Sequence, residues 1–212
     1  MEATNKESVG RKHFIQLTGY LLLMACLTGC AFSRTQVKIN FSPVVENQLK
    51  AAHTNRLKIG TIKDSRLVTD EFVLIHKSNA YGATSGAYIT DVPVAKIFQS
   101  GLQAALAQNG FTDGKQDEYK LNADLRGFGF GVIQGGLFNL TGKPWMEIRF
   151  ELDDGTTGQP VWHDTYTGQS TQKLSSWDGA NQELLVKMFS QVAEDAIKQL
   201  VADKTFRSFF EK

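Results

Sequence analysis

Tyr119-Lys120-Leu121-Asn122-Ala123-Asp124-Leu125-Arg126 is the stretch from which the fold of this 212-residue chain is most readily predicted. Its apolar and polar residues alternate strictly, which is typical of a strand with one face in a core. Beyond Gly127 the apolar residues change parity, to Phe128, Phe130 and Val132. Because a slip of one residue exchanges the two faces of a strand, this change predicts a β-bulge near Gly127.

Two further strands are expected after this one. A glycine-containing turn over 135–142 leads to an alternating stretch at 145–152. Residues 153–158 have the composition of a hairpin loop, and a returning strand is expected from Pro160 to Thr167. The pattern therefore predicts a three-stranded antiparallel meander.

Two long helices are indicated by apolar residues that recur every three or four positions. The first stripe consists of Val94, Ile97, Phe98, Gly101, Leu102, Ala105 and Leu106. Asp91 is expected to cap its start, and Asn109-Gly110-Phe111 supplies a left-handed stop. The second helix is expected to open at Asp178, with a stripe of Leu184, Leu185, Met188, Phe189, Val192, Ala193, Ala196, Ile197, Leu200 and Val201.

The region before the first helix predicts more strands. Val37, Ile39 and Phe41 alternate with polar residues until Pro43, which suggests an edge strand, and residues 56–62 predict another that ends in a turn. The long connection over 67–91 is either a functional loop or a short hairpin, and the hairpin is favoured because structureless loops of this length are uncommon. Asp64 and Arg66 are expected to form a local ion pair in the turn rather than a site.

These elements together predict an α+β fold. We expect an antiparallel sheet of about four to six strands, with two long helices packed on one face. The elements lie within residues 37–212, a length that suits a single domain with one core.

The N-terminal region predicts a lipid anchor. Arg11 and Lys12 precede an apolar run too short to span a bilayer, which ends in Leu27-Thr28-Gly29-Cys30. Leu, two small residues and Cys form the bacterial lipobox, which predicts a lipoprotein signal peptide over 1–29, lipidation of Cys30 by palmitate and similar chains, and a tether over 30–36. An ordinary secreted protein with a chance cysteine is the alternative.

The composition of the chain restricts its expected binding partners and its expected location. Removal of residues 1–29 takes away three basic and two acidic residues and leaves 20 basic and 20 acidic residues. The remaining chain has no net charge, so it lacks the positive charge that would attract nucleic acid. The two cysteines are Cys26, in the signal peptide, and Cys30, so no disulfide or cysteine-bound metal is expected. Ala31 follows Cys30, whereas Asp is the usual inner-membrane retention signal in that place. We therefore expect the protein to be anchored on the periplasmic side of the outer membrane.

No catalytic residue, metal site or cofactor is predicted. His13, His53, His76 and His163 lack ligand spacing, and His163 and Asp164 must point to opposite faces of their strand. The Ser-x-x-Lys motif of penicillin-recognising enzymes occurs at Ser170-Thr171-Gln172-Lys173. It is discounted because no Ser-Asp-Asn or Lys-Thr-Gly motif follows it. The glycines of 127–131 resemble part of a dinucleotide-binding motif, but the third glycine is at the wrong spacing and no helix is expected after it.

The C-terminal tail has two interpretations. Phe206, Phe209 and Phe210 would share one face of a helix, with Lys204, Arg207 and Lys212 on its flank. The tail can fold back and close the core, or it can dock as an amphipathic helix on a partner or on the bilayer.

Several short motifs resemble the YajG-type family of small Gram-negative envelope lipoproteins. They are the lipobox, the strand ending in Asp64-x-Arg66, the helix start Asp91-Val92-Pro93-Val94 and the stop Asn109-Gly110-Phe111. The resemblance implies a periplasmic α/β domain of unassigned activity, and it supplies no catalytic residues. The glycine-rich run over 127–136 and the Phe-rich tail depart from the family pattern.

The sequence thus favours a non-enzymatic outer-membrane lipoprotein that binds or scaffolds an envelope assembly and has an envelope protein as its partner. The alternative is a periplasmic carrier or chaperone of an apolar ligand such as a lipid, held between the glycine-rich strand and a helix. A third candidate, an envelope hydrolase, would require Ser, His and Asp side chains to meet in space.

Overall fold

The computed structural model describes residues 33–45, 56–68, 70–78, 84–111, 118–134, 140–174 and 181–210. The signal peptide, the lipobox with Cys30, His53 and Asp178 lie outside these residues. The chain divides into two compact units, Gln36–Ile75 with Ile89–Lys212 and Met1–Thr35 with His76–Tyr88.

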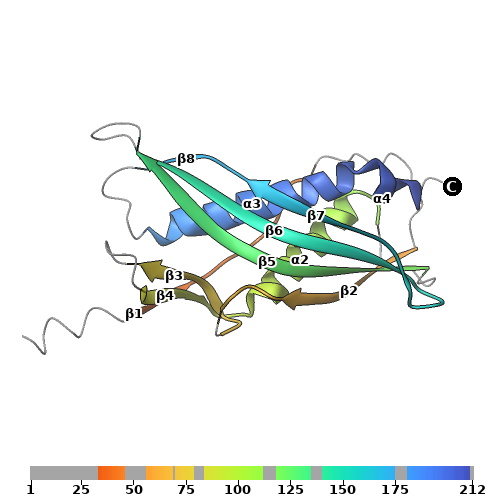
Figure 1. The fold of residues 1–212 in the computed structure, drawn as a ribbon, viewed down its shortest axis with the longest axis horizontal. Coiled ribbons are helices and arrows are strands. Elements are labelled where there is room, and N and C mark those ends of the chain that lie inside the picture. Colours follow the sequence, from red (N-terminus) through yellow and green to blue (C-terminus); the bar gives the residue numbers. More distant parts are fainter. Residues whose placement is uncertain are drawn as a thin grey trace, which may run out of the picture. The chain divides into compact units, whose positions relative to one another are not determined.

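The larger unit contains a five-stranded sheet in the order β2-β5-β6-β7, with β8 paired to β6 (Figure 1). Its strands are β2 (Leu57–Asp64), β5 (Tyr119–Gln134), β6 (Leu140–Asp154), β7 (Pro160–Gln169) and β8 (Gln172–Leu174). Strands β5, β6 and β7 form the predicted antiparallel meander. The register of β5 on β6 shifts between Leu125 and Gly127, which confirms the predicted bulge.

The prediction of an all-antiparallel sheet was wrong. Strand β2 pairs with β5 in parallel, with Leu57 opposite Tyr119 and Asp64 opposite Leu125. Parallel neighbours need a long crossover connection, and the segment between β2 and β5, which includes a helix, supplies it. Alternation within one strand does not reveal the direction of its neighbour, so the sequence pattern could not distinguish the two arrangements.

The helices are α2 (Val94–Gln108), α3 (Gln182–Ala202) and the short α4 (Lys204–Ser208). All seven residues of the predicted first stripe are buried. The cap was predicted wrongly, because Pro93 rather than Asp91 occupies the N-cap and no side chain caps the helix. The predicted stop is confirmed, since Asn109 is the C-cap and Gly110 has a φ of 85°. Helix α3 begins after Asn181, whose side chain accepts a hydrogen bond from the N–H of Glu183.

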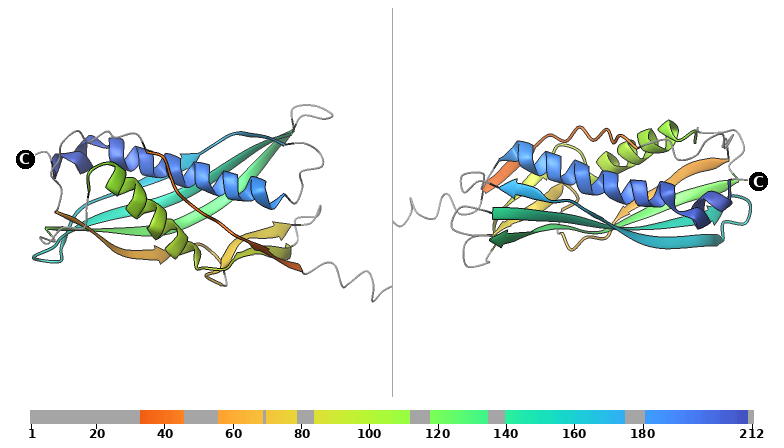
Figure 2. Two further views of the ribbon diagram at one scale, coloured as in Figure 1. Left: turned by 180° about the vertical axis from the view of Figure 1, so that it is seen from behind. Right: turned by 90° about the horizontal axis from the view of Figure 1, so that it is seen from above.

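Both long helices pack against strands of the larger unit. Helix α3 contacts β6 and β7, and α2 contacts β2 and α3 (Figure 2). The ring of Phe98 in α2 lies 6.3 Å from that of Phe150 in β6, and the ring of Phe189 in α3 lies 5.6 Å from that of Phe128 in β5. A Cβ atom on Gly168 of β7 would lie 1.8 Å from the carbonyl oxygen of Val192, so only glycine allows α3 to come this close.

The three-stranded sheet has the order β1-β4-β3, from β1 (Ser33–Val37), β3 (Val73–Ser78) and β4 (Thr84–Thr90). Strand β1 ends at Val37, where the predicted strand was to begin, and it occupies part of the predicted tether. Beyond it Ile39 and Phe41 are buried without forming a strand. The pairing of β3 with β4 confirms the predicted hairpin.

Candidate functional site

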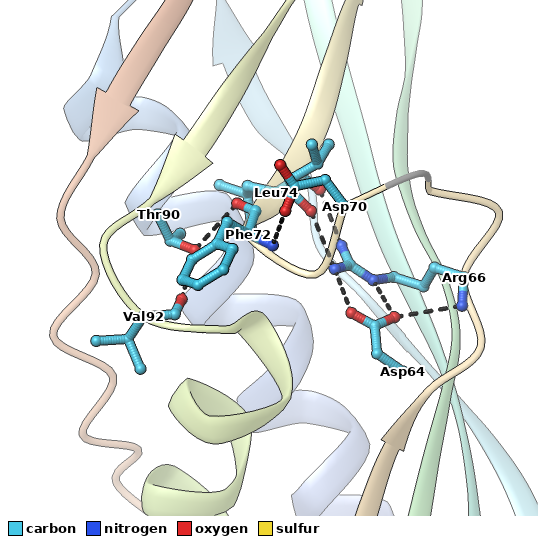
Figure 3. Close-up of polar contacts among 8 residues, drawn as sticks. Asp64, Arg66, Asp70, Phe72, Leu74, Thr90 and Val92 are labelled. Atoms are coloured by element: carbon cyan, nitrogen blue, oxygen red, sulfur yellow. Dashed lines mark hydrogen bonds and ion pairs between the residues drawn. The ribbon is translucent and has the colours of Figure 1, made fainter.

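The two polar clusters of the larger unit differ in character, and the first is the pair Asp64 and Arg66. The Arg66 guanidinium donates to both carboxylate oxygens of Asp64, at 2.8 and 2.6 Å. It also donates to the backbone carbonyls of Leu74 and Val73, at 2.9 and 3.0 Å (Figure 3). The side chains of Arg66 and Asp64 are only 4% and 9% exposed.

This pair is structural. Together these contacts link the end of β2 to the start of β3, and a guanidinium that uses four of its five N–H groups has little capacity left for a ligand. The neighbouring contacts have the same character, since the N–H of Phe72 bonds to Asp70 and the Thr90 hydroxyl lies within hydrogen-bond distance of the carbonyls of Phe72 and Val92 (Figure 3). The expected local ion pair is therefore present, and it is buried and extended to the backbone.

The second cluster is a groove of about 370 Å³ on the five-stranded sheet, called here the sheet groove. Side chains from three neighbouring strands line it: Thr61, Lys63, Lys120, Asn122, Ala123, Asp124, Arg126, Arg149 and Glu151. On β5 and β6 its polar members alternate with buried apolar residues. Strand alternation therefore places the groove on the side of the sheet away from those core residues.

The strand register gathers opposite charges in the groove. Asp124 of β5 stands opposite Lys63 of β2 on one side and opposite Arg149 of β6 on the other. Arg149 donates to Glu151 at 3.2 Å, and the Nε atom of Arg126 lies 3.6 Å from Asp124. With four cations and two carboxylates, the lining carries a surplus of positive charge. Each carboxylate has an arginine partner, whereas Lys63 and Lys120 form no ion pair with any residue that the structure describes.

An irregularity in β2 shapes one wall of the groove. The register of β2 on β5 shifts between Ile59 and Ile62, and the N–H of Thr61 is satisfied by the Asn122 side chain at 2.8 Å. Asn122 also donates to Asp153 at 2.6 Å. A Cβ atom on Gly60 would lie 2.2 Å from the Asn122 side-chain oxygen, so a larger residue there would displace this amide. The amide is thus fixed at both ends.

Two polar atoms of the groove residues lack a protein partner. The Oδ1 atom of Asp124 and the Nε atom of Arg149 are buried and accept or donate no hydrogen bond within the described residues. A buried polar group without a partner costs about 1–3 kcal/mol. Among the described residues, the polar network on this face is therefore left open, in contrast to the bonds around Arg66.

The groove was not predicted as a site. Its residues Lys120, Asn122, Asp124 and Arg126 were recognised only as the polar side of a strand. The available signal was that Lys120, Asp124 and Arg126, three of the four residues on this side, carry charges of both signs. That signal could not become a site without the parallel pairing that brings Lys63 beside Asp124.

The predicted docking residues of the tail lie against the protein's own aromatic rings. Phe206 and Phe210 are buried, with ring centroids 6.0 and 5.0 Å from that of Phe111, and Phe209 lies 5.6 Å from Tyr119. This is the arrangement expected of a tail that folds back. Docking through these residues would require the tail to detach, and it stays a prediction.

Asp203 fastens the tail. Its carboxylate accepts from the N–H of Phe206 at 2.8 Å and from the Tyr166 hydroxyl at 2.9 Å. Burial raises the pKa of Tyr166 far above its ordinary value, and the hydrogen bond to Asp203 and the negative charge of that residue add to the shift. The proton therefore stays on the tyrosine and in this bond.

The remaining predicted features have ordinary surroundings. His163 and Asp164 are exposed on β7, and the Asp164 carboxylate accepts from the N–H of Thr165. The Ser170 hydroxyl bonds to the Gln191 side chain. Across the ranges that the structure describes, no group of three or more His, Cys, Asp or Glu side chains could hold a metal ion. In the same ranges no helix is long and apolar enough to cross a membrane.

Comparison with known proteins gives a likeness of fold. No family model and no curated protein matches the chain. Protein XCC0632 from Xanthomonas campestris, of family model DUF330, is similar over 80% of this chain and 92% of its own, with 14% identity and a TM-score of 0.54. Weaker likenesses are to a minor lipoprotein from Acinetobacter baumannii (16% identity, 49% of this chain and 79% of its own, TM-score 0.35) and to lipoprotein GNA1162 from Neisseria meningitidis (12% identity, 69% and 98%, TM-score 0.26). The chain thus shares its fold with a DUF330 protein.

Proposed function

We propose that this chain is a non-enzymatic lipoprotein of the YajG type, held on the periplasmic side of the outer membrane by lipids on Cys30. Its folded part binds a component of the cell envelope through the sheet groove. The observation that supports this binding role is the groove itself, where three strands present four cations and two carboxylates on a face that the core does not use.

We further propose that α2 and α3 cover the other face of the same sheet. The contacts of Phe98 with Phe150 and of Phe189 with Phe128 support this arrangement. Phe150 follows Arg149 directly in β6, so its side chain points to the face opposite the groove. One face would then form the core and leave the other for recognition.

The lipid anchor follows from the sequence. The lipobox ends in Cys30, and Ala31 takes the place where Asp would retain the protein in the inner membrane. Each buried methylene contributes about 0.8 kcal/mol, so two or three acyl chains hold the protein firmly where one would not. Palmitate labelling and membrane fractionation test this step, and a Cys30→Ala protein that still fractionates with outer membranes would contradict it.

The polar lining distinguishes this role from the alternative of an apolar carrier. Six of the nine lining residues are charged, and a lipid chain gains nothing from such a surface. The space considered for an apolar ligand lies by the glycine-rich strand, where Phe128 already packs on Phe189 of α3. We therefore favour a polar partner.

Crosslinking in intact cells followed by purification of the tagged full-length protein tests the binding role. Lys63→Glu with Lys120→Glu reverses two exposed charges of the groove. We expect this variant to reach the membrane at normal abundance and to lose its crosslinked partner. Lys187→Glu is the matched control, because Lys187 is an exposed lysine on α3 outside the groove. Equal crosslinking by all three proteins would show that the groove is not the binding surface.

A further inference from the structure

Trp145 is a large aromatic side chain that is exposed on one of the strands that form the sheet groove. It is 41% exposed and stands opposite Gly129 in the pairing of β5 with β6. Its ring lies over the β5 backbone, since a Cβ atom on Gly127 would be 2.5 Å from the ring and one on Gly129 would be 3.2 Å from it. The two glycines thus give the indole a flat floor.

Stabilisation of the strand explains only part of this arrangement. An aromatic ring that covers a glycine across two strands shields the bare backbone and supports the pairing. That role uses one face of the indole. The exposed fraction of 41% shows that much of the ring still meets solvent, although aromatic side chains of this size are usually well covered.

The indole and the groove belong to one surface. Trp145, Glu147, Arg149 and Glu151 alternate along β6 with the buried Met146, Ile148, Phe150 and Leu152. On β5 the bulge places Arg126, which lines the groove, next to Gly127, which lies beneath the indole. Trp145 and Glu151 are six positions apart on the strand, which corresponds to about 20 Å. The surface is therefore a strip, long enough for a ligand of several units.

The chemistry of the strip selects among ligand classes. A sugar ring has an apolar C–H face that can stack on an indole, and its hydroxyls both donate and accept hydrogen bonds. The groove offers donors and acceptors side by side, in Thr61, Arg149 and Glu151. The groove has four cations and two carboxylates, and Glu147 adds a third carboxylate beside Trp145. Cations still outnumber carboxylates, and Lys63 and Lys120 lie outside the two arginine–carboxylate pairs, so the strip favours a ligand that carries acidic groups.

We infer that the strip formed by Trp145 and the sheet groove binds an acidic saccharide chain. One sugar ring stacks on the indole, and carboxylate or phosphate substituents of the following units lie on Lys63 and Lys120. This inference rests on the proposal that the groove is a binding surface, and it names the class of ligand.

Titration of the purified full-length protein in detergent tests the inference. The probes are an oligogalacturonate of three to six units, neutral maltohexaose and a short oligothymidylate. We expect the oligogalacturonate to bind and to change the tryptophan fluorescence, with Trp145→Ala weakening binding about tenfold and Trp145→Phe retaining most of it. Phe130→Ala is the matched control, because Phe130 is 40% exposed on β5 and alternates with the glycines beneath the indole. Lys63→Gln with Lys120→Gln should remove the preference for the acidic over the neutral probe.

The outcomes separate this inference from the proposed function. If the wild type binds no oligogalacturonate, or binds oligothymidylate equally well, the acidic-saccharide inference is wrong. If crosslinking nevertheless depends on Lys63 and Lys120, the groove binds a partner of another class and the proposed function stands. If neither the probe nor the crosslinked partner responds to the groove variants, both proposals fail. Binding that is lost equally in Trp145→Phe and Trp145→Ala would also overturn the stacking arrangement.

Discussion

Strand β5 has two sides that serve different purposes. On one side Leu121, Ala123 and Leu125 are at most 4% exposed and form part of the core. On the other, Lys120, Asn122, Asp124 and Arg126 line the sheet groove. Both sides share one backbone and one set of ladder hydrogen bonds, so the polar side can change without disturbing the core that holds the strand in place.

A second contrast lies between the two polar clusters of the larger unit. Arg66 bonds to a carboxylate and two backbone carbonyls, whereas the Oδ1 atom of Asp124 and the Nε atom of Arg149 have no partner in the part of the chain that the structure describes. Charges that a protein pairs completely in its interior support the fold, whereas charges left incompletely paired at an open surface are available for recognition. The variants below test both contrasts.

Substitutions on the core side should lower the stability more than substitutions on the groove side. Phe98 is fully buried, and its ring contacts those of Phe150 and Phe41. Phe98→Ala should lower the free energy of unfolding by about 3–5 kcal/mol, because it removes a large buried ring and leaves a cavity. Urea denaturation measures the loss. A loss below about 1 kcal/mol, the size typical of a surface substitution, would mean that α2 does not cover the core.

The Asp64–Arg66 pair should be almost as sensitive as the core. Arg66→Ala leaves the Asp64 carboxylate buried without its partner, which should cost about 3–5 kcal/mol in urea denaturation. The double variant Asp64→Ala with Arg66→Ala should lose less than the sum of the two single variants, since it leaves no unpaired charge. Additive losses would show that the two side chains act independently. Arg126→Ala, in the groove, is the comparison and should cost less than about 1 kcal/mol.

Substitution of Tyr166 should have an intermediate effect on stability, since its ring is buried while its hydroxyl bonds to Asp203. Tyr166→Phe should cost about 1 kcal/mol at pH 7 through the loss of that hydrogen bond. The effect should depend on pH, because the pKa of Tyr166 is raised in the folded protein. A group with a raised pKa stabilises the fold below its unfolded pKa and loses this contribution as the pH rises above about 10.

The difference between wild type and Tyr166→Phe should therefore shrink in urea denaturation from pH 8 to pH 11. A difference that stays constant over this range would show that the hydroxyl does not hold its proton in the bond to Asp203. Tyr119→Phe is a suitable control, because it removes a tyrosine hydroxyl elsewhere in the same unit.

Local patterns predicted much of the fold. Parity along β5 revealed the bulge near Gly127, and helical periodicity revealed every buried residue of α2. Non-local features escaped. The parallel pairing of β2 with β5 depends on the path of the connecting chain, and the position of β1 depends on its pairing with β4. Asp91 has the residue type of a helix cap, but the backbone places Pro93 in that position instead.

The candidate site was harder to predict than the fold. Lys63 and Asp124 are 61 positions apart, and only the register of two parallel strands brings them together. Trp145 was predicted only as the start of a strand, and the packing of its ring over Gly127 and Gly129 depends on the pairing of β5 with β6. A sequence pattern records which side of a strand is polar, whereas the neighbours of each polar side chain are set by pairing.

The groove lysines should have the smallest effect on stability. Lys63 and Lys120 are exposed on the strands that line the groove. An exposed lysine keeps its charged head in water, so little of the protein's stability depends on its contacts with neighbouring side chains. Lys63→Gln and Lys120→Gln should therefore change the free energy of unfolding by less than about 0.5 kcal/mol each. Relief of repulsion within a positively charged groove could make the change slightly favourable at low salt, and the benefit should fade as salt is added, because surface charges are screened. Urea denaturation of each variant at low and high ionic strength measures this difference. A loss above about 2 kcal/mol would place these lysines among the residues that hold the fold, and the two sides of the sheet would then no longer differ in the way proposed.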